Sequence, residues 1–365
     1  MRYPRRTFVA AVGGLALAGC LDGSEQAADP AGDDSNGGGG DGDDDPDPES
    51  ASLLLNFQPG GLHAHYYAAL DRGYYAEEGI DLEAIESGQG SDFSAQQAAL
   101  GNTEFAITSG DQVLNVNSQE GLDLRCVSVV MQQGPTVVFT AREEFGEELT
   151  DASQLEGLTV GSGPGMVRTM TESFLDHHDV LDSVEYVDSG FDTVQQLLTG
   201  EIDAAGGVFS DVIDAQHQDV TTDVLSVNEV IPSYGHVVGV GDDYLEANPE
   251  TVRGFIRATA RGAAWAHRNP EEAIDVLIDH EPELGEVREN QLDKWVEMST
   301  EYMLADAVAD HGWGWNDPEP WEATHETLEA GDFLEGEVDP DDVWTNEFID
   351  EEAEYVGDYA TIVDE

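Results

Sequence analysis

Short apolar runs alternate with stretches of helical spacing along residues 51–141, and this alternation constrains the fold more than any other feature. Runs typical of strands begin at Leu53, Ile80, Phe105, Cys126 and Val137. Helical stretches are expected over 64–72 and 93–100, after the first two runs. Strands separated by helices of about ten residues predict an α/β architecture with mostly parallel pairing.

The same alternation starts again near residue 158. Strands are expected over 158–160, 184–187 and 204–209, and helices over 166–177 and 193–198. Two such modules predict two lobes, because single cores rarely grow beyond about 250–300 residues. After the apolar run 237–240 the chain is expected to be mainly helical. Its best helix spans 249–268, where Pro249 stands at the start and Val252, Phe255 and Ile256 recur at helical spacing.

The charge balance is the second constraint. The 365 residues include 13 Lys+Arg and 78 Asp+Glu, a formal net charge of −65. This excludes an ordinary nucleic-acid-binding protein, which needs a basic surface. Because 40% of the residues are hydrophobic, the charge does not indicate disorder. A folded chain this acidic repels itself in dilute salt, whereas molar salt screens the repulsion. We therefore expect a protein of a haloarchaeal-type cell.

The first nineteen residues are typical of an export signal. Arg5-Arg6 precedes a short apolar run that ends at Cys20 in the sequence LAGC. The run is too short to span a bilayer, which takes about 20 residues. We interpret 1–19 as a twin-arginine lipoprotein signal peptide and Cys20 as the lipidated residue that attaches the chain to the membrane. An ordinary signal peptide with a chance cysteine is the alternative.

Residues 20–50 contain few large apolar side chains and are rich in Gly and Asp. We expect this segment to be an acidic flexible tether. Cys20 and Cys126 are the chain's 2 cysteines, so a lipidated Cys20 leaves no intramolecular disulfide. Cys126 stands in an apolar run and is expected to be a buried, unreactive side chain.

Several segments in order resemble one family. The stretch 57–81 reads FQPGGLHAHYYAALDRGYYAEEGID, and its GYYxxEG element is quite specific. Further matches are GQG at 88–90, LGNTEFAI at 100–107, LEGLTVG at 155–161, LTGEIDAA at 198–205, NPE at 248–250, NPEEA at 269–273 and WTNEFI at 344–349. Over about residues 52–350 the chain is similar to the NMT1/THI5-like solute-binding proteins. These are ABC-importer receptors for thiamine pyrimidine precursors, with nitrate, sulfonate and taurine receptors as relatives.

The resemblance implies a type II periplasmic-binding fold, in which two α/β lobes joined by two crossover segments close on a ligand. One lobe would be 51–141 plus 237–365, and the other 142–236. It also implies an extracytoplasmic, lipid-anchored monomer that delivers a small solute to an ABC permease and its ATPase, with no cofactor. An aminopyrimidine is the expected solute. A nitrate, sulfonate or taurine receptor is the alternative, as is an enzyme or sensor domain of the same fold.

In open α/β sheets, ligands bind beyond the carboxyl ends of the strands, at the loops that lead into helices. Turn and capping chemistry alone also explains many polar residues there. The candidate ligand residues in these loops are Asn56, Phe57, Gln58, His63, Tyr66, Gly88, Gln89, Ser109, Asp111, Ser162, Gly163, Asp211, Tyr234 and His236.

The residue types in these loops bear on the ligand's chemistry. Phe57, Tyr66 and Tyr234 are candidates to stack on a planar heterocycle, and Asp111 or Asp211 to accept from an exocyclic amine. This set favours an aminopyrimidine. A sulfonate or nitrate would need donors instead, such as Ser162, Arg168 and free N–H groups at the start of the helix over 166–177. Trp313 and Trp315 are further aromatic candidates, although packing within the lobe is the preferred interpretation.

Arg253, Arg257 and Arg261 form a stripe at i, i+4 spacing. The simplest interpretation is pairing with neighbouring carboxylates. A docking strip for the permease is the alternative.

Enzyme and metal interpretations find little support. The family resembled includes a pyrimidine-forming branch that relies on iron and a cysteine-rich motif, which Cys126 alone cannot supply. The pairs His63-x-His65 and His177-His178 lack clustered Cys or a third ligand at metal spacing, so we expect solvated or core histidines and no metal. There is no GxSxG motif or phosphate-binding P-loop.

Overall fold

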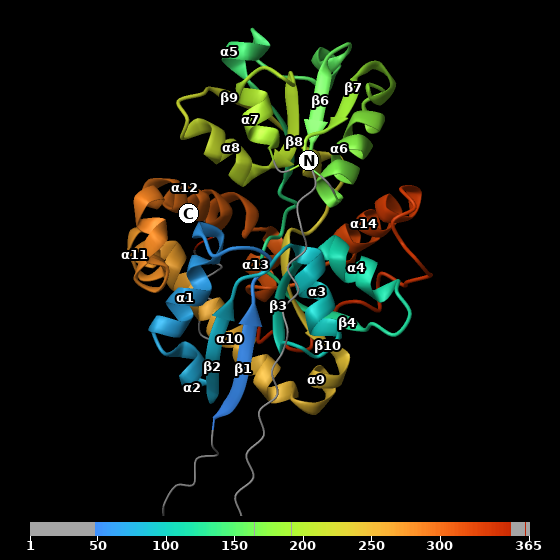
Figure 1. Ribbon diagram of the computed structural model, residues 1–365. Helices are drawn as coiled ribbons and strands as arrows, with labels where there is room; N and C mark the ends of the chain where they lie inside the picture. The colour runs from blue at the N-terminus through green and yellow to red at the C-terminus, as the bar shows by residue number, and fades with distance from the viewer. Residues whose placement is uncertain (1–47, 164, 191, 352–361, 363–365) are drawn as a thin grey trace, which may run out of the picture. The chain divides into compact units, whose positions relative to one another are not determined.

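Two five-stranded sheets organise the protein, and Figure 1 labels most of their strands. The computed structural model describes residues 48–351 except Pro164 and Phe191, together with Ile362. Both sheets belong to one compact unit, Pro46–Glu365. The first sheet has the order β2-β1-β3-β10-β4, and the second has the order β7-β6-β8-β5-β9.

The first sheet consists of β1 (Glu49–Leu54), β2 (Ile80–Glu86), β3 (Phe105–Ser109), β4 (Leu124–Val129) and β10 (His236–Gly241). The second consists of β5 (Thr136–Ala141), β6 (Thr159–Ser162), β7 (Glu185–Asp188), β8 (Ala204–Val208) and β9 (Thr222–Ser226). We call each sheet with the helices packed on it a lobe.

Helices and short turns fill the intervals between the strands. Those of the first lobe are η1 (Gly61–His63), α1 (Ala64–Asp71), α2 (Tyr74–Glu77), α3 (Ser91–Ala99), α4 (Gly110–Asn117), α9 (Asp242–Ala247), α10 (Pro249–Arg268), α11 (Pro270–His280), η5 (Pro282–Val287), α12 (Arg288–Glu297), the π-helical turn η6 (Met298–Tyr302), α13 (Asp306–His311) and α14 (Pro318–Ala330). Those of the second lobe are α5 (Arg142–Phe145), η2 (Ala152–Leu155), α6 (Met166–His177), η3 (Leu181–Ser183), α7 (Thr193–Leu198) and α8 (Phe209–Gln216); η4 (Val227–Glu229) follows β9.

Each sheet is covered on both faces, as α/β architecture requires. Along β3, Phe105 and Ile107 face the core built with α1 and α10, whereas Ala106 faces the core built with α3 and α4. Along β5, Val138 packs with α6, and Phe139 packs with α7 and α8. Alternation with a period of two places successive residues on opposite faces. The central strands β3, β5 and β10 therefore need uncharged, mostly apolar residues at nearly every position, whereas the edge strands β2 and β7 are partly exposed.

Pairing is mixed in both sheets, so the expectation of mostly parallel strands is wrong for two of them. β1 runs parallel to β2 and β3, and β6 runs parallel to β7 and β8. In contrast, β10 is antiparallel to β3 and β4, and β5 is antiparallel to β8 and β9. Each of these two strands is the first one after the chain crosses from one sheet to the other. Each runs in the direction opposite to that of its neighbours in the sheet it joins.

The change of sheet differs from the expected lobe boundary at residue 141. β5 was expected in the first lobe, but it lies inside the second sheet between β8 and β9. The crossovers are therefore 130–135, between β4 and β5, and 227–235, between β9 and β10. An apolar run predicts a strand but does not indicate which sheet the strand joins, because that depends on partners distant in sequence.

The bounds of several helices and strands agree with those expected from the sequence, and others do not. The helices over 166–177, 193–198 and 249–268 are confirmed with these bounds, whereas the strand β9 was not expected. β1 already begins at Glu49, which pairs with Ile80, so the expected tether cannot extend to residue 50. Cys20, the expected signal peptide and the tether up to residue 47 lie outside the described residues. No helix within the described ranges is long and apolar enough to cross a membrane.

Candidate functional site

The carboxyl edges of the two sheets adjoin the same crossovers. In the first sheet the start of β10 lies beside the end of β3, because His236 pairs with Ser109. In the second sheet the start of β5 lies beside the end of β8, because Thr136 pairs with Val208. The short crossover 130–135 joins these two edges, which places the loops after β1, β2 and β3 on one side of it and those after β6 and β8 on the other.

The two crossovers contact each other closely. The Gly235 N–H donates to the Met131 carbonyl at 3.1 Å, and the Gly134 N–H donates to the side-chain oxygen of Asn228 at 2.9 Å. A Cβ on Gly235 would lie 2.7 Å from the sulfur of Met131, and one on Gly134 would overlap the hydroxyl of Ser233. Glycine is therefore needed at both positions for the two segments to pass side by side.

Asn56, His63 and His236 form a hydrogen-bonded cluster at the edge of the first sheet. Nε2 of His63 lies 2.9 Å from Oδ1 of Asn56, and Nδ2 of Asn56 lies 3.0 Å from Nε2 of His236. The two rings are stacked with centroids 5.8 Å apart. Two residues seven positions apart thus meet a third that lies 180 residues from Asn56, at the point where the sequence places the ligand, although their ligand contact stays a prediction.

The amide of Asn56 forces the two histidines into opposite tautomers. Burial is the main cause that lowers the pKa of His63 to about 3 and that of His236 to about 4, so both rings are neutral at pH 7. One end of an amide donates and the other accepts, so one Nε2 carries a proton and the other does not. The remaining Nδ1 atoms, which have no hydrogen-bond partner among the described residues, are then one donor and one acceptor.

Phe57 is the exposed aromatic ring of this edge. Its side chain is 54% exposed, unlike the other aromatic residues predicted in these loops. The loop after β2 holds the backbone of Asn56 and Phe57 in place. The Gly88 N–H donates to the Phe57 carbonyl at 3.0 Å, and the Gly90 N–H donates to the Asn56 carbonyl at 2.8 Å. Gly88 has no room for a Cβ, which would overlap the Leu55 carbonyl. Gln58 and Gln89, in the loops after β1 and β2, are also exposed.

Tyr66 and Tyr234 are not available as stacking platforms, which corrects their expected role. Tyr66 is fully buried in the core of the first lobe, because it lies on the inner side of α1 with its ring against that of His65. Tyr234 is buried edge-on against Trp321, and its hydroxyl accepts from the backbone N–H of Asp317 at 2.7 Å. Both rings contribute to packing instead.

Asp111 lies beside Ser109 at the start of α4. Burial raises the pKa of its carboxyl group, while bonds from Ser109 and Gln112 lower it. The Gln112 side-chain nitrogen donates to it at 2.7 Å. Asp111 is therefore a buried, already bonded acceptor.

The second sheet presents Ser162, Gly163 and Asp211 at its own edge. Ser162 is buried, and its hydroxyl is hydrogen-bonded to that of Tyr186. The Asp211 carboxylate accepts from the backbone N–H of Val208 at 2.9 Å, and burial raises its pKa. Tyr186 was missed by the sequence analysis, because its contact with Ser162 arises only when β6 and β7 pair.

The positive charge of Arg168 is already paired with a carboxylate. Its guanidinium lies over the Tyr186 ring at 5.4 Å, and its Nε donates to Glu172 at 2.7 Å. An anion at the start of α6 would have to compete with this carboxylate.

The family can now be stated from comparisons with known proteins. The sequence profile described as "NMT1/THI5 like" matches residues 61–273, more than half of the chain. The chain belongs to this NMT1/THI5-like family.

Two proteins similar to this NMT1/THI5-like chain are named as binding proteins. The riboflavin-binding protein RibY of Chloroflexus aurantiacus is 28% identical over 82% of this chain and 85% of its own length. The formylaminopyrimidine-binding protein of Halalkalibacterium halodurans is 27% identical over 81% of this chain and 90% of its own length. A 4-amino-5-hydroxymethyl-2-methylpyrimidine phosphate synthase of Legionella pneumophila is 24% identical over 64% of this chain and 74% of its own, so relatives also include an enzyme.

The fold agrees with a solved periplasmic protein. The periplasmic aliphatic sulphonate binding protein SsuA of Escherichia coli superposes with a TM-score of 0.64 at 14% identity, covering 81% of this chain and 92% of that one. This confirms the expected type II periplasmic-binding-protein fold.

Cys126 has the buried position that its apolar run predicts. Its thiol lies 3.4 Å from the side-chain oxygen of Asn316, and burial raises its pKa. Trp313 is buried in the core of the first lobe, and Trp315 is stacked on His311 with centroids 4.0 Å apart. Packing, the preferred interpretation of both tryptophans, is thus confirmed.

The histidine pairs lie in different surroundings. His65 is buried against Trp295, and His177 and His178 meet edge to face on α6 with ring centroids 5.1 Å apart. Within the described ranges, no group of three or more His, Cys, Asp or Glu is arranged to hold a metal ion.

The arginine stripe pairs with acceptors, as its simplest interpretation predicts. Arg253 donates to the Glu347 carbonyl at 2.7 Å, and Arg261 pairs with Glu77 at 2.7 Å. Arg257 pairs with Glu78, the residue that follows α2. The stripe therefore holds α10 to its neighbours within the lobe.

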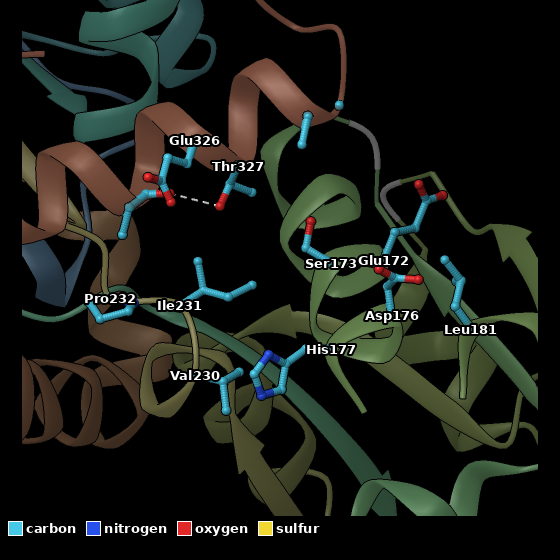
Figure 2. A pocket seen from close by; sticks show the side chains of 13 residues that line it. Glu172, Ser173, Asp176, His177, Leu181, Val230, Ile231, Pro232, Glu326 and Thr327 are labelled. Carbon is cyan, nitrogen blue, oxygen red and sulfur yellow. Dashed lines mark hydrogen bonds between the residues drawn. The ribbon is translucent and has the colours of Figure 1, made fainter. Parts of the chain in front are cut away.

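A separate groove of about 480 Å³ lies between α6 and α14. Figure 2 shows Glu172 and Asp176 on the α6 side and Glu326 on the α14 side, with Ile231 of the second crossover between them. None of the ligand residues predicted from the sequence lines it. Its carboxylates make it unsuitable for an anion.

Proposed function

We propose that this chain is the solute-binding receptor of an ABC importer and captures an aminopyrimidine-like heterocycle between its lobes. The observation that carries the proposal is the exposed ring of Phe57, the residue that directly follows Asn56 of the Asn56–His63–His236 cluster. Together they supply a flat apolar surface and, at the two buried Nδ1 atoms that have no partner among the described residues, one hydrogen-bond donor and one acceptor. A ring that carries both an amine and a ring nitrogen matches this set.

In the proposed mechanism the solute first contacts the first-sheet loops. Phe57 stacks on its ring, and the histidine cluster binds its polar edge. Closure about the crossovers then brings the loops of Ser162, Gly163 and Asp211 onto the opposite side and presents the closed form to the permease and ATPase. Gln58, Gln89, Ser109 and Asp111 are proposed to line the first-lobe side.

The cellular setting is part of the same proposal. We infer export through the twin-arginine signal, lipid attachment at Cys20 and a monomer on the outer face of the membrane of a halophilic cell. The acidic tether would keep the receptor near its permease, and nucleic acid is no partner of so acidic a surface.

A sulfonate or nitrate is the second candidate, and the fold of SsuA is the observation that favours it. The pairing of Arg168 with Glu172 weighs against it. An enzymatic role has its support in the related synthase. The burial of Cys126, the single thiol in the described residues, weighs against thiol chemistry.

Thermal unfolding in molar salt tests these alternatives. A ligand that binds the folded state raises the melting temperature by mass action. At a ligand concentration one hundred times its Kd, the free energy of unfolding rises by about 2.7 kcal/mol. We expect formylaminopyrimidine to raise it, and an alkanesulfonate and nitrate to have no effect. A shift with the sulfonate alone would support the second candidate. Turnover of any compound would contradict the receptor proposal.

A further inference from the structure

Helix α8 is an element of the second lobe that packs directly on the first. Val212 and Ala215 belong to the core of its own lobe, whereas Phe209 and Ile213 belong to the core of the first lobe. The Phe209 ring is stacked on that of Tyr302 with centroids 4.2 Å apart. Figure 1 shows α8 next to α12, whose polar side chains face it.

A single carboxylate on α8 accepts two hydrogen bonds from α12. Oδ1 of Asp214 lies 2.7 Å from Nζ of Lys294, the chain's only lysine, and 2.9 Å from Nδ2 of Asn290. Asn290 is buried. If α8 moved away from α12, this buried amide would lose its acceptor.

The hydrogen bonds continue from Asn290 into the first lobe. Nε2 of Gln291 donates to Oδ1 of Asn290 at 3.0 Å, and the backbone N–H of Gly61 donates to Oε1 of Gln291 at 2.7 Å. A carboxylate can only accept and a backbone N–H can only donate. These two ends fix the orientation of both amides between them.

Gly61 connects this series to the candidate ligand site. It begins the turn η1, which ends at His63, and Nε2 of His63 donates to Oδ1 of Asn56 within the histidine cluster. Gly61 lies so close to α12 that a Cβ would overlap the Gln291 carbonyl. The turn that carries His63 is therefore held directly against α12.

We propose that the series Asp214–Asn290–Gln291–Gly61, here called the relay, couples closure of the second lobe to the position of His63. This inference rests on the proposed function. When α8 is in place, Asp214 holds Asn290, Asn290 holds Gln291, and Gln291 holds the turn that presents His63. Because such coupling is reciprocal, a ligand that holds His63 stabilises the contact between α8 and α12.

Hydrogen exchange tests the relay without any ligand. Asp214→Ala removes the acceptor on α8, and we expect peptides covering 56–63 to exchange about two- to tenfold faster, the equivalent of one hydrogen bond. His217→Ala is the matched control: it removes the other pair between these elements, His217 with Asp293 at 2.7 Å, which is outside the relay. Equal exchange in Asp214→Ala and the wild type would overturn the relay, as would equal acceleration in both variants.

Gln291→Met and a binding titration complete the test. Gln291→Met keeps the side chain's length and removes the acceptor for Gly61, so the same peptides should exchange faster even if α8 stays in place. Asp214→Ala should also weaken binding of formylaminopyrimidine about two- to tenfold, with His217→Ala binding as the wild type. Faster exchange with unchanged affinity would overturn the coupling to the ligand. Wild-type protein that binds no probe, with the exchange effect intact, would contradict the proposed function and support the relay as a link between the lobes.

Discussion

The side-chain nitrogen of Asn56 lies 3.0 Å from Nε2 of His236, although 180 residues separate the two in the chain. His236 is the first residue of β10, the strand that returns from the second lobe, and Asn56 follows β1. The bond therefore joins the beginning of the first lobe to the end of a crossover. A movement of the crossover would therefore change or break the hydrogen bond to Asn56.

Replacing Asn56 tests the cluster directly. Asn56→Leu leaves both histidine Nε2 atoms without a partner, so we expect the free energy of unfolding to fall by about 2 kcal/mol. Urea denaturation in molar salt measures it. Asn102→Leu removes an exposed asparagine that bonds only Gln97, and a change within about 0.5 kcal/mol is expected there. Equal losses in the two variants would contradict the importance of the cluster.

Acid should destabilise the protein through its buried histidines. The folded-state pKa values of His63 and His236 are lowered by burial to about 3 and about 4, from 6.5. Below pH 6.5 the unfolded chain binds protons on these rings and the folded chain does not, so stability falls as the pH drops toward 4. Each ring contributes at most about 1.4 kcal/mol per pH unit.

The variant His63→Gln isolates this effect from that of the carboxylates. We expect its free energy of unfolding to depend less steeply on pH between 6.5 and 4 than that of the wild type, measured by denaturant titration at each pH. His280→Gln changes an exposed histidine as the control. Parallel curves for His63→Gln and the wild type would show that His63 is charged in the folded state.

The crossover contact predicts a steric effect at Gly235. Gly235→Ala places a methyl group 2.7 Å from the sulfur of Met131, so we expect a loss of about 1–3 kcal/mol in thermal unfolding. Gly285→Ala is the matched control, since its Cβ would meet Ile278 at an ordinary 3.5 Å. A Gly235→Ala protein as stable as the control variant would show that the crossovers can separate at little cost.

Phe57 and Tyr234 should respond differently to mutation. Phe57→Ala removes an exposed ring, so stability should change by about 0.5 kcal/mol or less while affinity for formylaminopyrimidine falls about three- to tenfold. Tyr234→Phe removes the hydroxyl that accepts from Asp317 and should lower stability by about 1 kcal/mol. Calorimetric titration and thermal melts separate the two outcomes. Lost affinity in Tyr234→Phe with unchanged stability would restore it as a ligand residue.

The net charge of −65 predicts a requirement for salt. Lowering the ionic strength from about 1 M to about 0.01 M lengthens the Debye length from about 3 Å to about 30 Å, which exposes each carboxylate to the repulsion of many others. The melting temperature should therefore fall steadily with dilution. A melting temperature that does not depend on salt would contradict the halophilic interpretation.

Local patterns in the sequence were enough to locate most elements. The helix α10 has the expected bounds because Pro249 starts it and buried residues recur at helical spacing, both of which are properties of neighbouring residues. The loops after β1 and β3 could be identified for the same reason, since a strand that ends in polar and turn residues indicates its own carboxyl end. Asn56, Phe57 and His63 were predicted as ligand residues in this way, and their contact with a ligand stays a prediction.

Contacts between distant residues were beyond such patterns. Tyr66 and Tyr234 look like exposed loop aromatics in the sequence, and only the helices packed over them show that they are buried. The pair Asp214 and Lys294 could not be predicted from local patterns, because the two side chains meet only when α8 packs against α12.

The sequence by itself determined the order of strands and helices, the acidic surface and the family resemblance, because each depends on composition or on residues close together in the chain. The tertiary structure decided that β5 joins the second sheet, that Asn56 meets His236, and that a relay of amides connects α8 to the turn carrying His63. The physical reason is that pairing and burial are chosen among partners far apart in the chain, by packing and hydrogen bonding that no single segment contains.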